Sequence, residues 1–191
     1  LQIISPSMGA ADHNQPVVVN GQLLLAGNAV HSFWDIADPY RPTQISTLTS
    51  PHHDGEAESH QVSWMTDGEN HFLSTISGRG IDLWDVTDVD APELLSALEL
   101  PGVDYGDNSE AVWGVAWQGS HVFVGGTNTG LHVVDASDPR APVVVAHLTI
   151  AELGGVSAGP VFAIGNLLVV TTPKNHAGVA TVDISAPDAP A

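Results

Sequence analysis

The sequence contains no cysteine and very few cationic residues, and each shortage excludes a class of function. Without cysteine, neither a disulfide framework nor thiol chemistry is available. Only 4 Lys and Arg residues stand against 22 Asp and Glu residues, which gives a formal net charge of −18 at pH 7. Nucleic acids and anionic membrane surfaces bind cationic side chains, so we expect neither as a partner. Cations and basic partners are compatible with this charge.

Long apolar runs and the common catalytic motifs are also missing. The longest apolar stretches have the length of β-strands, so no membrane insertion is expected. There is no glycine-rich phosphate loop, no Ser-His-Asp arrangement and no basic-aromatic patch. A cysteine-free, lysine-poor β protein suits export, which predicts a secreted, periplasmic or cell-surface location in a bacterium.

What the sequence does contain is one motif written four times. The third copy reads Gly130-Leu-His-Val-Val-Asp-Ala-Ser-Asp-Pro-Arg-Ala-Pro142. Each copy has an aspartate at the same point, in steps of 50, 50 and 48 residues: Asp35, Asp85, Asp135 and Asp183. A fixed period in this range indicates a repeat architecture. Because a catalytic site needs only one copy of each residue, we expect these aspartates to brace turns.

The third repeat divides into four short β-branched runs, at residues 112–117, 121–125, 131–135 and 143–150. Gly, Asn, Asp and Pro separate these runs, and no segment has a helical period. We therefore predict an all-β fold, a β-propeller of four-stranded antiparallel blades in four repeats of about 50 residues. The predicted domain spans residues 1–191, with blades at about 11–50, 58–100, 111–150 and 157–191.

The pattern Leu-x-Val-Val-Asp-x-Ser-Asp-Pro-x-x-Pro of residues 131–142 resembles the LVIVD repeat of bacterial β-propeller proteins. The resemblance extends over essentially the whole chain. The second repeat departs from it at Val89, where Pro is expected, and the fourth at Ala186, where Asp is expected. The resemblance implies an exported or surface propeller, but it implies no particular ligand.

The two ends of the chain leave two arrangements of the blades open. The fourth repeat stops where its fourth strand is due, whereas residues 1–5 have the pattern of an extra outer strand. Residues 1–5 either complete the last blade in a closed four-bladed ring, or the repeats are a segment of a seven- or eight-bladed ring. We favour the segment, because four blades lie at the low end of the known range. A second chain or further blades would then complete the ring.

The connections between blades hold the candidate metal ligands, because they gather on one face of a propeller and are long and polar. The first connection combines imidazole and carboxylate groups, which suit Zn, Mn, Fe or Cu. Its candidate ligands are His52, His53, Asp54, Glu58 and His60. We place His60 at the channel mouth. The spacing matches no established metal motif, so the alternative is a solvated acidic loop.

The next connection contains Asp104, Asp107 and Glu110, whose oxygen atoms are suitable ligands for Ca²⁺. It lacks the glycine position and the terminal glutamate spacing of an EF-hand. A hydrogen-bonded turn is therefore the alternative.

Four further residues on the same face are candidates for contact with a ligand: Arg79, Trp113, Lys174 and His176. Arg79 and Lys174 belong to turns between second and third strands, where they either orient an anionic group or neutralise the acidic loops. Trp113 lies near the start of a first strand, and packing in the core is the alternative for it.

These observations predict a scaffold that binds a protein, glycan or small ligand through the face with the long loops. The alternative is a metal-dependent hydrolase or oxidoreductase with a His and carboxylate site at the channel mouth. No cofactor is assigned beyond a candidate divalent metal. The enzyme hypothesis requires stoichiometric metal that His60→Ala removes.

Overall fold

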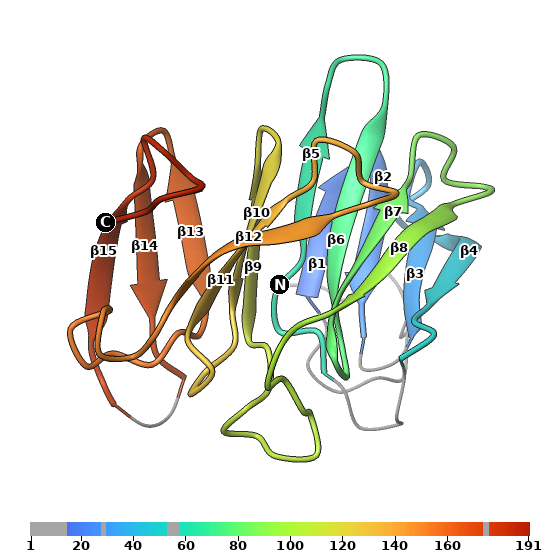
Figure 1. Ribbon diagram of the computed structural model, residues 1–191. Helices are drawn as coiled ribbons and strands as arrows, with labels where there is room; N and C mark the ends of the chain where they lie inside the picture. The colour runs from blue at the N-terminus through green and yellow to red at the C-terminus, as the bar shows by residue number, and fades with distance from the viewer. Residues whose placement is uncertain (1–14, 28–29, 53–57, 174–175) are drawn as a thin grey trace.

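The computed structural model describes residues 15–27, 30–52, 58–173 and 176–191 (Figure 1). Within these ranges every regular element is a β-strand. The strands form four antiparallel sheets, which follow one another along the sequence. No described segment is a helix long and apolar enough to cross a membrane. The predicted all-β fold with antiparallel blades is confirmed.

Each sheet is one blade. Blade 1 contains β1 (Gln15–Val19), β2 (Gln22–Ala26), β3 (Val30–Asp35) and β4 (Thr43–Thr49). Blade 2 contains β5 (Ser63–Thr66), β6 (His71–Ser77), β7 (Gly80–Asp85) and β8 (Glu93–Glu99). Blade 3 contains β9 (Gly114–Gln118), β10 (His121–Gly125), β11 (Leu131–Asp135) and β12 (Val143–Leu148). Blade 4 contains β13 (Val161–Ile164), β14 (Leu167–Thr171) and β15 (Val179–Asp183), and the extra strand predicted at residues 1–5 lies outside the described residues.

The recurring aspartate explains why each third strand ends at the same point of the repeat. In blade 1 the Asp35 carboxylate accepts a hydrogen bond of 2.8 Å from the backbone N–H of Ala37. The same bond recurs two residues beyond Asp85, Asp135 and Asp183, at 2.8–2.9 Å. A short acidic side chain that binds its own backbone two residues on stabilises a turn. The turn-bracing role predicted for these aspartates is confirmed.

Neighbouring blades pack face to face through apolar side chains. We call the face toward the preceding blade the leading face and the opposite one the trailing face. The trailing face of blade 1 contributes Leu24 and Phe33 to a core with Leu73 and Trp84 of the leading face of blade 2. Equivalent cores join blades 2 and 3 and blades 3 and 4. The described blades are therefore joined by three versions of one interface.

Side-chain amides join the innermost strands across the blades. Gln15 Oε1 accepts a hydrogen bond of 2.8 Å from the backbone N–H of Val62, at the start of blade 2. Gln61 makes the equivalent bond to Val115 of blade 3 at 3.3 Å, and it also binds both backbone groups of Val161 in blade 4. These amides satisfy polar groups at strand edges that would otherwise be unpaired.

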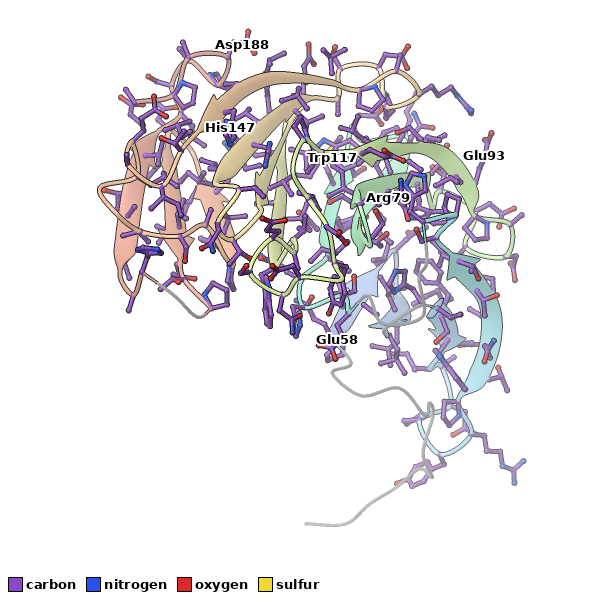
Figure 2. All side chains as sticks on the ribbon, turned by 60° about the horizontal axis from the view of Figure 1, so that its bottom comes forward. Glu58, Arg79, Glu93, Trp117, His147 and Asp188 are labelled. Atoms are coloured by element: carbon purple, nitrogen blue, oxygen red, sulfur yellow. The ribbon has the colours of Figure 1, made fainter. Side chains whose placement is uncertain are left out.

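The four blades follow one another along an open arc rather than a closed ring (Figure 2). Blade 1 and blade 4 lie at opposite ends of this arc. Among the described strands, no hydrogen-bonded pairing joins the two end blades. The connections between β8 and β9 and between β12 and β13 both emerge at the lower side of Figure 1.

Candidate functional site

Two connections from different blades meet in a stack of aromatic rings. His60 lies just before β5 and Trp113 just before β9. Their ring centroids are 4.0 Å apart with an interplanar angle of 14°. The carboxylate of Glu58 lies 2.9 Å from His60 Nε2. We refer to Glu58, His60 and Trp113 as the mouth cluster.

The fold of the connection between β8 and β9 fixes the position of Trp113. The backbone N–H of Tyr105 donates to the carbonyl of Gly78 at 3.0 Å, which attaches this connection to blade 2. Buried Tyr105 and Ala111 pack with Trp113 in a small apolar cluster. The indole Nε1–H donates to the carbonyl of Asn108 at 3.3 Å. Trp113 is therefore held on several sides and keeps part of its surface exposed.

The acidic residues of the same connection are engaged in its own turns. Asp104 Oδ1 accepts from the backbone N–H of Gly106 at 2.9 Å. Asp107 Oδ1 accepts from both the N–H and the hydroxyl of Ser109, at 2.8 and 2.6 Å. The backbone of Glu110 bonds to Asp104 and Asp107. These contacts give the carboxylates a structural role, and Ca²⁺ binding by them stays a prediction.

His52 points to a different carboxylate from that bound by His60. Its Nε2 lies 3.6 Å from Glu99 Oε1, and the guanidinium of Arg79 lies 3.4 Å from the same oxygen. Arg79, Glu99 and Asp104 help to line a cavity of about 580 Å³. Figure 2 shows Arg79 over blade 2, and Glu58 closer to the inner edge of the arc. Arg79 thus partly neutralises an acidic side chain of blade 2.

The structure separates the candidate metal ligands of the first connection into two places. His52 is paired with Glu99, and His60 with Glu58. Among the described residues there is no group of three His, Asp or Glu side chains close enough to hold a metal ion. His53, Asp54 and the ligand candidate Lys174 lie outside the described residues.

His176 lies on the same side of the molecule, in the connection between β14 and β15. It is exposed and has a positive φ of 53°. Its carbonyl accepts a weak hydrogen bond of 3.4 Å from the backbone N–H of Ser157. Contact between His176 and a ligand stays a prediction.

Two buried residues with strongly shifted pKa values, Asp82 and His132, have no counterpart in the predictions from sequence. Asp82 lies fully buried on the leading face of blade 2. Burial raises its pKa to about 6, although the Ser50 hydroxyl and the charge of His52 act to lower it. The alternation in Ile81-Asp-Leu-Trp84 was the available signal, because it places Asp82 on the same face as Trp84.

His132 is the second of these residues, and it is buried on the leading face of blade 3. Burial and the adjacent His147 lower its pKa to about 4. The Thr129 hydroxyl donates to the carbonyl of Gly126, so it accepts from His132 Nε2–H at 3.1 Å. The buried Nδ1 atom has no hydrogen-bond partner. A second proton would therefore have no acceptor, which explains why the neutral ring is favoured.

Comparison with known proteins identifies the repeat. Residues 111–149, which contain blade 3, match the family model described as LVIVD repeat. Blade 3 is an LVIVD repeat. The resemblance stated from the sequence is confirmed there, and the aspartate-braced turn of the LVIVD repeat recurs in the other three blades. No curated protein matches the chain.

Solved structures agree on the architecture. The computationally designed Ika4 protein superposes with a TM-score of 0.60 at 13% identity, and the match covers 94% of this chain and 96% of that one. BamB from Moraxella catarrhalis superposes with a TM-score of 0.56 at 16% identity, over 87% of this chain. The chain spans only 41% of the length of BamB. Both neighbours are β-propellers, and at these identities the likeness concerns the fold alone.

Proposed function

We propose that this LVIVD-repeat protein is an exported or cell-surface scaffold, which binds a protein, glycan or small ligand through its long-loop face. The observation that carries the proposal is the mouth cluster. There the His60–Trp113 stack joins two connections at the inner edge of the arc, with a carboxylate beside it. Aromatic rings with an adjacent polar group are typical of ligand-binding surfaces. A cysteine-free, lysine-poor composition supports export.

Charge limits the class of ligand. The chain carries a formal charge of −18, and the cluster adds Glu58 at the surface where the ligand would bind. Arg79, on the same face, lies next to Glu99 and so contributes little free positive charge. The proposed ligand is therefore neutral or cationic, such as an uncharged oligosaccharide or a basic peptide segment, rather than a polyanion.

The same geometry supports a scaffold better than the metal-dependent enzyme. A catalytic zinc site commonly uses three protein ligands and one open position. In the described part of the chain, the mouth cluster supplies one imidazole and one carboxylate. Binding through stacking and hydrogen bonds needs no third ligand.

The test is a binding measurement on two variants of the mouth cluster, with a tryptophan outside the cluster as the matched control. Neutral oligosaccharides and basic peptides are titrated by calorimetry into the protein and into its His60→Ala and Trp113→Ala variants. We expect each variant to weaken binding about tenfold, which corresponds to about 1.4 kcal/mol for a lost aromatic contact. The control is Trp64→Ala, because Trp64 stacks on His71 at 5.6 Å and 13° within one hairpin outside the mouth cluster. Equal losses in all three variants would contradict the proposal.

A further inference from the structure

The trailing face of blade 4 is apolar and uncovered. Phe162, Ile164 and Val179 are 62%, 60% and 65% exposed. The strand registers place Phe162 level with Ala116, and Val179 level with Leu131, in blade 3. Both of these blade 3 residues are buried against blade 4. In blades 1, 2 and 3 the trailing face is covered by the next blade. The trailing face of blade 4 is of the same kind, but it is exposed.

The leading face of blade 1, at the other end of the arc, is also uncovered. Leu23 pairs with Trp34 across β2 and β3, as Leu73 pairs with Trp84 in blade 2. The blade 2 pair is buried against blade 1, whereas Leu23 and Trp34 are only half-buried. On the inner strand of blade 1, Val18 is 60% exposed. Among the described residues, no blade covers the leading face of blade 1 as blade 1 covers that of blade 2.

We infer that two copies of the chain associate head to tail, with the trailing face of blade 4 in one copy packed on the leading face of blade 1 in the other. Three interfaces of this construction already exist within each chain. The two uncovered faces are the two halves of a fourth such interface. A second copy supplies both halves, and a twofold axis makes the two new joints identical. The product is a single ring of eight blades.

The arc explains why the partner is a second copy rather than the other end of the same chain. The two faces lie at opposite ends of the four blades (Figure 2). To bring them together within one chain, the three packed cores would have to change their geometry, and well-packed cores resist such deformation. A second arc closes the ring without altering them.

The charge of the chain predicts an unusual salt dependence. Exposed apolar side chains line the two faces, among them Val18, Phe162 and Val179, but each copy carries a formal charge of −18. Association thus buries apolar surface against long-range repulsion, and salt screens this repulsion. Higher ionic strength should strengthen the dimer, the opposite of an interface held by ion pairs.

Sedimentation velocity on the full chain tests the inference. We expect a dimer whose dissociation constant rises more than about 100-fold in Val18→Asp and in Phe162→Asp, because each variant places a carboxylate in both joints. Val143→Asp is the matched control: Val143 is 57% exposed on β12 and belongs to neither face. Since all three positions are exposed in a single chain, circular dichroism should show unchanged folding.

A mixture of the two variants distinguishes head-to-tail contact from contact between identical faces. Val18→Asp keeps an intact blade 4 face and Phe162→Asp keeps an intact blade 1 face, so the mixture can form one normal joint and should recover a weak heterodimer. A folded monomer at all concentrations would overturn the inference. So would a dimer that only one of the two variants disrupts, or open oligomers that grow with concentration.

Discussion

At the scale of single residues, Asp82 couples stability to pH. Its carboxyl group is fully buried between blades 1 and 2, and burial raises its pKa from 3.8 to about 6. The folded state therefore holds this proton more tightly than the unfolded state does. Protonation of Asp82 stabilises the fold below about pH 4, and this contribution is lost as the pH rises through 6.

Asp82→Asn should remove this loss of stability at higher pH, because the amide does not titrate. A rise in pKa from 3.8 to about 6 corresponds to about 3 kcal/mol, so relative to Asp82→Asn the native protein should lose about this much unfolding free energy between pH 4 and pH 8. The measurement is urea denaturation at several pH values. His132, whose pKa is lowered to about 4, acts in the opposite direction, since its contribution is lost as the pH falls from 6.5 through 4. The difference between the two proteins isolates Asp82.

The control for this prediction is Asp90→Asn, which removes an exposed carboxylate from a turn of the same blade. Its pH profile should follow that of the native protein. A profile for Asp82→Asn that runs parallel to the native one would mean that Asp82 does not titrate in this range.

At the scale of elements, the side chain of Gln61 joins three of the described blades. From the start of blade 2 its amide makes three hydrogen bonds, one to Val115 in blade 3 and two to Val161 in blade 4. Gln61→Ala should lower the free energy of unfolding by about 2 kcal/mol, because it leaves these backbone groups unpaired in partly buried positions. Urea denaturation measures this change.

Gln118→Ala is the comparison, because Gln118 makes one exposed bond, to the carbonyl of Gly165 in blade 4. We expect it to cost less than about 0.5 kcal/mol. Equal effects from the two substitutions would show that the bonds of Gln61 do not add to the stability of the blade interfaces.

The elements themselves are predictable from sequence because their signals are local. Asn20 and Gly21 both have positive φ, which allows the two-residue turn between β1 and β2. The turn after β7 forms despite Val89 at the proline position, because the Asp85 carboxylate still binds the N–H of Thr87 at 2.9 Å. The turn is specified within four residues, so one substitution relative to the repeat pattern does not abolish it.

The mouth cluster could be predicted only in part, because its contacts are not local. The repeat placed His60 at the channel mouth and Trp113 near the start of its strand. Nothing in the sequence specified that their rings stack, or that His52 lies beside Glu99 instead of joining His60. Such pairings depend on how the blades turn relative to one another. For the same reason, the sequence does not reveal the hydrogen bond between Gln61 and Val161, which are 100 residues apart.

At the scale of the whole molecule, the described blades form an open arc. Four blades pack through three equivalent cores, and the arc ends in two complementary apolar faces. Association of two arcs would also bring two mouth clusters to one face of the ring. The ligand proposed for that face would then meet two equivalent sites, so two bound ligands per ring are expected.

Native mass spectrometry of the untagged chain tests the two-copy ring and the metal-free mouth cluster together, because one spectrum reports both the number of copies and any bound metal. At raised ammonium acetate concentration, we expect a species of twice the chain mass that carries no stoichiometric transition metal. A compact monomer across the concentration range would contradict the two-copy ring. About one equivalent of transition metal per chain, lost in His60→Ala, would replace the scaffold with a metal-dependent site at the mouth cluster.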